Sequence, residues 1–157
     1  MPLLLVLLAL VMTPVQRPTD VVKWSATAPV SPVRAGEVAV VKVTAKVQPG
    51  WKLYAIEQPP DGPRPLAFEI ARGSGLAISQ KQIGAPKAKV QKQDENFSLD
   101  TRYYEHDVAF TVPVTVPRPA PAGPQQVPLE VTFQACGAEL CLRPFTQKLP
   151  VEISVRQ

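Results

Sequence analysis

The sequence has little of what most catalytic sites are built from, since it holds one histidine and two cysteines among 157 residues. The single histidine, His106, lies between Glu105 and Asp107, and we expect it in a surface turn rather than in a Ser-His-Asp arrangement. Two thiolates and one distant histidine also leave a zinc site short of ligands unless a carboxylate joins them. The composition therefore disfavours triad hydrolases and metal sites, and we expect neither a metal nor a cofactor.

The sequence also lacks any stretch with the periodicity of an amphipathic helix. Proline, by contrast, is abundant, with 19 residues, and it removes a backbone donor and fixes φ. This density favours short strands joined by rigid loops. Hydrophobic residues make up 45% of the chain and charged residues only 19%, which disfavours wholesale disorder.

Positive and negative residues are nearly balanced along the sequence, so the charge alone does not indicate a binding partner. The net charge is +4, and the one cluster of basic residues contains no interleaved aromatic side chains of the kind a nucleic-acid platform uses. The cluster consists of Lys81, Lys87, Lys89 and Lys92. We interpret it as a solvated loop and strand face, with nucleic acid or anionic lipid as the weaker alternatives.

The N-terminus carries an apolar run of ten residues, Leu3 to Met12, which is short for a bilayer span and typical of a signal-peptide core. No Lys or Arg precedes the run, and no Ala-x-Ala cleavage site follows it. We predict a signal peptide and short linker over residues 1–20, with a retained anchor or a misplaced start as alternatives. Export would place the cysteines in an oxidising compartment, where a disulfide can form.

From residue 21 onward apolar residues recur at every second position, which is the strand signature. The rows fall at 41–47, 51–55, 66–70, 76–78, 108–116, 127–133 and 145–155. Because the alternation is one-sided, each sheet buries one face, so two sheets must pack together. We predict a single all-β domain over residues 21–157, an immunoglobulin-like β-sandwich of roughly eight strands with no helix.

The two cysteines lie close together, in the segment Cys136-Gly-Ala-Glu-Leu-Cys141 between the last two strong strands. Continuing the alternation of 127–133 predicts that Cys136 emerges toward solvent or a loop, and Gly137 can supply unusual backbone angles. A disulfide closing so small a loop stabilises the fold by only roughly 2 kcal/mol, whereas accessible disulfides are easily reduced. Spacing alone leaves a redox centre and a passive hairpin clip equally supported, since C-x4-C is less specific than C-x-x-C.

Three stretches resemble the N-terminal periplasmic domain of the DsbD family of thiol:disulfide interchange proteins, which carry electrons across the bacterial inner membrane. The first runs from Val131 through both cysteines to Pro144 and is followed by a strand ending at Val155. Pro49 to Tyr54 resembles the family's Gly-aromatic-x-Leu-Tyr strand, and Asp94 to Phe97 resembles its Asp-Glu-Phe cap loop. The resemblance covers residues 21–155.

The resemblance implies an immunoglobulin-like domain that takes electrons from a DsbD-type transmembrane carrier or a thioredoxin-like donor. It would pass them to periplasmic thioredoxin-like proteins as a monomeric component of a protein-disulfide reductase, in electron transport and cytochrome c biogenesis. By the family pattern the second cysteine, Cys141, forms the mixed disulfide and the first, Cys136, resolves it.

The family pattern also assigns the residues around the pair. Phe97, on a mobile loop from about Gln93 to Asp100, would shield the sulfurs, and a ring packed on sulfur excludes small oxidants. Tyr54 would line the site. The carboxylates of Asp94 and Glu95 would tune the thiols, because nearby negative charge disfavours a thiolate.

Two positions depart from the family pattern. Asn96 interrupts the Asp-Glu-Phe run, and Arg143 replaces the first of two prolines that follow the second cysteine. A cation beside Cys141 favours its thiolate. The sequence contains neither the transmembrane electron carrier nor the thioredoxin domain of the family. If the chain works as a relay, we expect other proteins to supply these two parts. The alternative function is a non-catalytic exported binding module with a structural disulfide.

Overall fold

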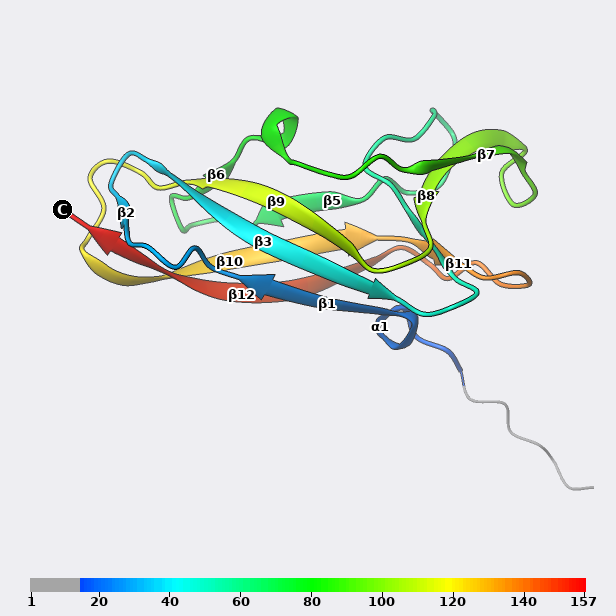
Figure 1. The fold of residues 1–157 in the computed structure, drawn as a ribbon, viewed down its shortest axis with the longest axis horizontal. Coiled ribbons are helices and arrows are strands. Elements are labelled where there is room, and N and C mark those ends of the chain that lie inside the picture. Colours follow the sequence, from blue (N-terminus) through cyan, green and yellow to red (C-terminus); the bar gives the residue numbers. More distant parts are fainter. Residues whose placement is uncertain (1–14) are drawn as a thin grey trace, which may run out of the picture.

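The computed structural model describes residues 15–157, so the predicted signal-peptide core lies outside the described residues. The described chain forms strands arranged in three four-stranded sheets (Figure 1). The first sheet has the order β1 (Val22–Thr27), β3 (Val38–Val47), β9 (Val108–Thr115) and β6 (Ala77–Ile78). The second has the order β2 (Val33–Arg34), β12 (Phe145–Arg156), β10 (Gly123–Phe133) and β5 (Ala67–Ile70).

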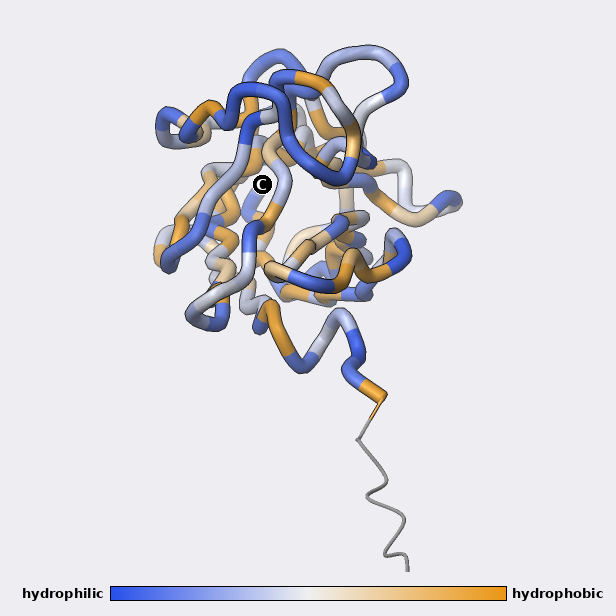
Figure 2. The backbone as a smooth tube through the Cα atoms, turned by 90° about the vertical axis from the view of Figure 1, so that its right-hand side faces the viewer, coloured by the Kyte–Doolittle hydropathy of each residue, from blue (hydrophilic) through white to orange (hydrophobic). Residues whose placement is uncertain are grey.

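The first and second sheets face each other, and their inner side chains make the core. Along β3 the exposed and buried positions alternate strictly from Val38 to Lys42. Figure 2 shows apolar and polar stretches following each other along the backbone. Trp24 of the first sheet joins the layers, because its ring centroid lies 6.1 Å from that of Phe68 and 5.4 Å from that of Phe133. Burying each such large side chain contributes roughly 1.5–3 kcal/mol.

The predicted all-β immunoglobulin-like sandwich is confirmed, with two differences in detail. The first concerns helices: we predict none beyond the signal segment and short turns, and residues 15–157 contain two short ones, α1 (Pro18–Val21) and the 3-10 helix η1 (Gln80–Gln82). Pro18 opens α1, where its missing N–H has no helical partner to lose. Among residues 15–157 no helix is long and apolar enough to cross a membrane.

The second difference is a third sheet, which the apolar rows did not predict. Its order is β11 (Ala135–Cys136), β4 (Lys52–Tyr54), β8 (Leu99–Tyr104) and β7 (Lys89–Asp94). It lies at the end of the sandwich remote from the C-terminus (Figure 1). β11 joins this sheet after the chain leaves β10 at Phe133. The chain returns as β12 at Phe145, which is the cross-strand partner of Phe133. The excursion between these two strands carries both cysteines.

Candidate redox site

Cys136 and Cys141 form a disulfide across a small antiparallel hairpin. Two backbone hydrogen bonds flank the pair, from the Gly137 N–H to the Leu140 carbonyl (2.8 Å) and from the Leu142 N–H to the Ala135 carbonyl (3.0 Å). The two Cα atoms are 4.0 Å apart. The sulfur bond therefore joins residues that the backbone already holds opposite each other.

The two cysteines differ in exposure. Cys136 is only 1% exposed, whereas Cys141 is half-buried and lies at the surface. The prediction that Cys136 emerges toward solvent is therefore wrong. The alternation of β10 ends here, because the adjacent residues Ala135 and Cys136 are both buried. After Phe133 the chain no longer pairs with β12, and β11 pairs with β4 instead.

Gly137 serves the hairpin in a different way from the one that the sequence predicts. Its φ is not among the positive values found at other glycines of the described chain. A Cβ at this position would lie 3.4 Å from two atoms of the Trp51 indole ring. The hairpin backbone therefore packs beside Trp51, at a distance where an added Cβ would make an ordinary van der Waals contact. The sequence placed Trp51 only in a strand.

Asp94 anchors the turn between β7 and β8. One of its carboxylate oxygens accepts hydrogen bonds from the hydroxyls of Tyr54 (3.0 Å) and Thr101 (2.8 Å). The other accepts from the backbone N–H (3.0 Å) and the side-chain amide (3.2 Å) of Asn96. Asp94 is 1% exposed and Tyr54 is fully buried, so this polar cluster joins β4 to the turn inside the protein.

The pKa values of the two groups follow from this cluster. Burial favours the neutral form of Asp94, but hydrogen bonds from Asn96, Thr101 and Tyr54 outweigh it and hold the Asp94 pKa below its usual range. Burial, followed by the hydrogen bond to Asp94, raises the pKa of Tyr54 far above its ordinary value. Tyr54 is thus a neutral donor and Asp94 a charged acceptor at neutral pH.

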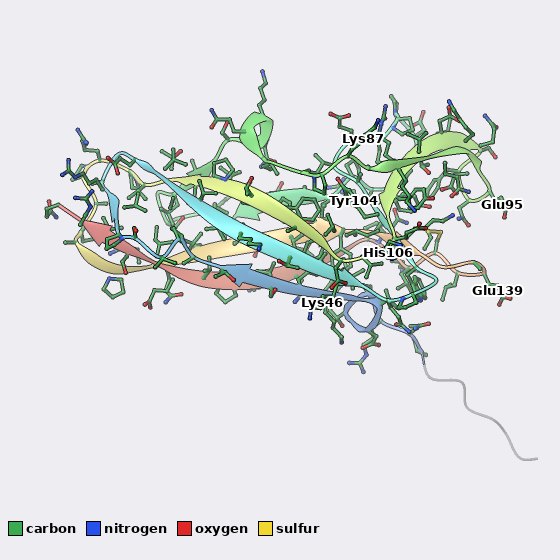
Figure 3. The ribbon with its side chains drawn as sticks, in the orientation of Figure 1. Lys46, Lys87, Glu95, Tyr104, His106 and Glu139 are labelled. Carbon is green, nitrogen blue, oxygen red and sulfur yellow. A yellow bond between two sulfur atoms is a disulfide. The ribbon has the colours of Figure 1, made fainter. Side chains whose placement is uncertain are left out.

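Phe97 sits on this anchored turn. Its ring packs edge-on against Tyr54, with centroids 5.5 Å apart, and its backbone N–H donates to the Asp94 carbonyl (3.1 Å). The predicted cap segment is largely a β-hairpin, and only residues 95–98 form its turn. The structure therefore brings Phe97, Tyr54 and Asp94 together, while Glu95 is exposed at the outer end of the hairpin (Figure 3).

An apolar groove adjoins Cys141. Its wall on one side is the segment 140–145, in which Leu140 is 50% exposed and Phe145 39% exposed. The N-terminal residues Val15, Gln16 and Pro18 form part of the groove lining. Arg143, exposed, is its charged lining residue. Sequence reasoning missed Leu140 and Phe145, because a strand pattern assigns faces but not the exposure of apolar side chains beside a loop.

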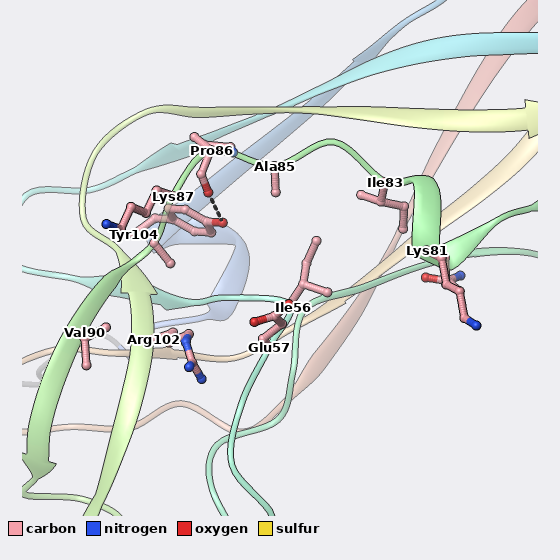
Figure 4. Close-up of a pocket in the computed structure, with 12 residues that line it drawn as sticks. Ile56, Glu57, Lys81, Ile83, Ala85, Pro86, Lys87, Val90, Arg102 and Tyr104 are labelled. Carbon is pink, nitrogen blue, oxygen red and sulfur yellow. Dashed lines mark hydrogen bonds between the residues drawn. The ribbon is translucent and has the colours of Figure 1, made fainter.

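A second hollow lies on the other face of the third sheet and contains neither cysteine (Figure 4). Arg102 and Tyr104 of β8 line it, and these residues alternate with Thr101 and Tyr103, which point to the opposite face. The Tyr104 hydroxyl donates to the Pro86 carbonyl at 3.0 Å. Within residues 15–157 no three His, Cys, Asp or Glu side chains are grouped closely enough to hold a metal ion.

Fold and site together define an immunoglobulin-like domain with a hairpin disulfide, one sulfur buried and the other at the surface. Residues 19–153 match the family model described as thiol:disulfide interchange protein DsbD, N-terminal, and the chain belongs to this family. The predicted family resemblance is thereby confirmed.

The chain also resembles solved structures, and the first of the two described next supports the fold. The N-terminal periplasmic domain of ScsB from Proteus mirabilis superposes with a TM-score of 0.60 at 15% identity, covering 87% of this chain and 49% of that chain. The chain therefore spans about half the length of that solved periplasmic domain. The CssB subunit of the enterotoxigenic Escherichia coli colonization factor CS6 superposes with a TM-score of 0.41 at 12% identity, over 87% of this chain and 98% of that one. No curated protein matches the sequence.

Proposed function

We propose that this chain is a periplasmic thiol-disulfide exchange domain. It relays reducing equivalents from a DsbD-type transmembrane carrier or a thioredoxin-like donor to periplasmic thioredoxin-like proteins through Cys136 and Cys141. The observation that carries the proposal is the asymmetric disulfide, in which a family cysteine pair has Cys141 at the surface beside an apolar groove and Cys136 buried. The relay unit is the domain of residues 21–157, exported by the segment before it.

The exchange balances over two steps. A donor dithiol reduces the Cys136–Cys141 disulfide, and the donor becomes a disulfide while the domain gains two electrons and two protons. The Cys141 thiolate then attacks a client disulfide and displaces one client sulfur as a thiolate. The Cys136 thiolate attacks the Cys141 sulfur of this mixed disulfide, restores the internal bond and releases the reduced client.

Access decides which sulfur reacts with partners. A thiolate must approach a disulfide sulfur in line with the S–S bond, and only Cys141 lies at the surface. Any partner that reaches Cys141 also covers Leu140 and Phe145, so the groove is the proposed seat for the apolar surface around a thioredoxin-like active site. Arg143 beside it favours the Cys141 thiolate.

The neighbouring residues take supporting roles in this proposal. Phe97 shields Cys136 and Cys141, and Tyr54 holds the Phe97 ring in place through their edge-on contact. Asp94 acts on the thiols through the turn that it anchors, because within the described residues its carboxylate accepts hydrogen bonds from Tyr54, Thr101 and Asn96. Glu95, at the exposed tip, adds negative charge near an approaching partner.

The reduction potential of the pair tests the function. We expect a value above about −300 mV, because structural disulfides of secreted proteins lie below that level and resist reduction by the glutathione pool. Equilibration of the purified domain with defined glutathione mixtures, read by thiol alkylation and mass, gives the value. A potential far below that of glutathione would instead support a non-catalytic binding module with a structural clip.

Replacing Phe97 with alanine tests the shield. We expect the reduced Phe97→Ala protein to react several-fold faster with hydrogen peroxide, because an aromatic cover over the pair is removed. Stopped-flow loss of free thiol measures the rate. Val90→Ala is the control, since Val90 is an exposed apolar residue of the same hairpin and lines the hollow on the opposite face of the sheet. Equal rates for Phe97→Ala and the parent would show that Phe97 is not the shield.

A further inference from the structure

The register of the third sheet places a lysine directly beside the buried cysteine. Cys136 of β11 is the cross-strand partner of Lys52 in β4. Directly opposite residues of an antiparallel pair project to the same face, with Cβ atoms roughly 4.5–5.5 Å apart. Lys52 and Cys136 therefore share one face of the sheet, as do Tyr54 on β4 and Tyr103, the β8 partner of Tyr54.

The direct contacts of the Lys52 ammonium are neutral groups, and the Glu105 carboxylate, whose charge also interacts with Lys52, is already paired with Lys89. It donates a hydrogen bond to the side-chain carbonyl of Gln91 on β7, and it lies 5.2 Å from the centroid of the Tyr103 ring. The lysine side chain is half-buried. A partly desolvated cation with amide and aromatic partners alone still lacks a full counter-charge.

The carboxylates nearby are engaged or remote. On the same hairpin, Glu105 pairs with Lys89 and Asp100 with Lys92. Asp94 is occupied by the hydroxyl and amide donors described above. Glu95 and Glu139 are exposed at the tips of their hairpins (Figure 3). Reduction of the disulfide creates a new acidic group, the Cys136 thiol, directly across from Lys52.

We propose, resting on the relay function above, that Lys52 is the cation partner of the Cys136 thiolate. On reduction its flexible four-carbon stem lets the ammonium leave Gln91 and approach the Cys136 sulfur. The attraction raises the thiolate fraction of Cys136, and this thiolate attacks the Cys141 sulfur of the mixed disulfide while the partner sulfur leaves as a thiolate. Arg143 serves Cys141 and Lys52 serves Cys136, so each sulfur has its own cation.

The first test isolates Cys136 in a Cys141→Ser protein and follows thiolate absorbance in the far ultraviolet as the pH rises. We expect Lys52→Gln to move the titration of Cys136 to higher pH and Lys52→Arg to restore it. Lys92→Gln is the matched control, because Lys92 is an exposed lysine of the same sheet that pairs with Asp100, and it should leave the titration unchanged. Identical titrations with Lys52 and with Gln at this position would overturn the proposal.

The second test separates the two chemical steps with an aromatic disulfide, 5,5′-dithiobis(2-nitrobenzoate), as the probe. Attack by Cys141 releases one thionitrobenzoate, and resolution by Cys136 releases the second. We expect Lys52→Gln to slow the second release about three- to fivefold, the effect of one partly screened charge pair, and to leave the first unchanged. Slowing of both releases, or of neither, would overturn the proposal.

Because the probe needs no protein partner, these results stand apart from those for the relay. Lys52→Gln could change the Cys136 titration and the second release while the domain exchanges disulfides with no thioredoxin-like protein. That result would contradict the proposed function and still support the coupling of Lys52 to Cys136. Thermal unfolding of the oxidised Lys52→Gln protein is the folding control. If Lys52 had only a structural role, the substitution would lower the unfolding temperature. We expect the unfolding temperature to stay the same while the titration of Cys136 moves.

Discussion

Replacing Cys136 with alanine is expected to trap a stable mixed disulfide between Cys141 and a thioredoxin-like periplasmic protein. The remaining Cys141 thiolate lies at the surface and can still attack a partner, but the thiol that resolves the adduct is gone. Cys141→Ala should trap little, because Cys136 is 1% exposed. Non-reducing electrophoresis of the mixture, followed by mass spectrometry of the linked peptides, identifies which cysteine is joined.

The double variant Cys136→Ala, Cys141→Ala is the control for non-specific association and should give no adduct. The trap is best measured with a purified thioredoxin-like protein whose own resolving cysteine has been replaced and whose remaining cysteine carries a mixed disulfide with thionitrobenzoate. The Cys141 thiolate then displaces thionitrobenzoate as the protein–protein disulfide forms. The same trap is repeated with an extract of the native compartment. If neither single variant forms an adduct in either setting, the relay fails and the pair is a hairpin clip.

Replacing Asp94 with alanine is expected to destabilise the oxidised domain by about 2–4 kcal/mol. The substitution leaves the buried hydroxyls of Tyr54 and Thr101 without their acceptor, and each unsatisfied buried group costs roughly 1–3 kcal/mol. Urea unfolding followed by circular dichroism measures the loss. Asp100→Ala is the matched control, because Asp100 lies on the same hairpin but pairs at the surface with Lys92, and it should change stability little.

The Asp94 contribution has a defined pH dependence. Its folded pKa lies below the ordinary value of 3.8, so the stabilisation is fully present above that value and is lost as the pH falls through the folded pKa. The parent protein should therefore lose stability in acid more steeply than Asp94→Ala does. Parallel acid slopes for the two proteins would contradict the anchoring role of the Asp94 carboxylate.

The long strands were predictable because each has a single buried face. The rows in β3, β9, β10 and β12 alternate over enough residues to fix which side meets the opposite sheet. The family motifs named the cysteines, Tyr54, Asp94 and Phe97, and the structure does bring the last three together. These predictions rest on patterns that are local in sequence.

The third sheet escaped prediction because, apart from β4 within the row 51–55, its strands carry no predicted apolar row. β11 has two residues and β4 three, and their pairing depends on residues far apart in the chain. The depth of Cys136 and the position of Lys52 beside it both follow from that pairing. Asp94 illustrates the same limit, since its motif suggested direct action on the thiols, whereas its hydrogen bonds anchor a turn.

The hairpin that holds the two cysteines has a consequence for the reduced protein. Its flanking backbone hydrogen bonds, Gly137 to Leu140 and Leu142 to Ala135, do not involve sulfur, and we expect them to survive reduction. The Cys136 thiol then stays beside Cys141 at a high effective concentration, because the backbone has already lost the freedom that a bimolecular encounter would have to remove. Any adduct on Cys141, including one with a free small thiol, should be expelled by this neighbour faster than a dissolved thiol could displace it.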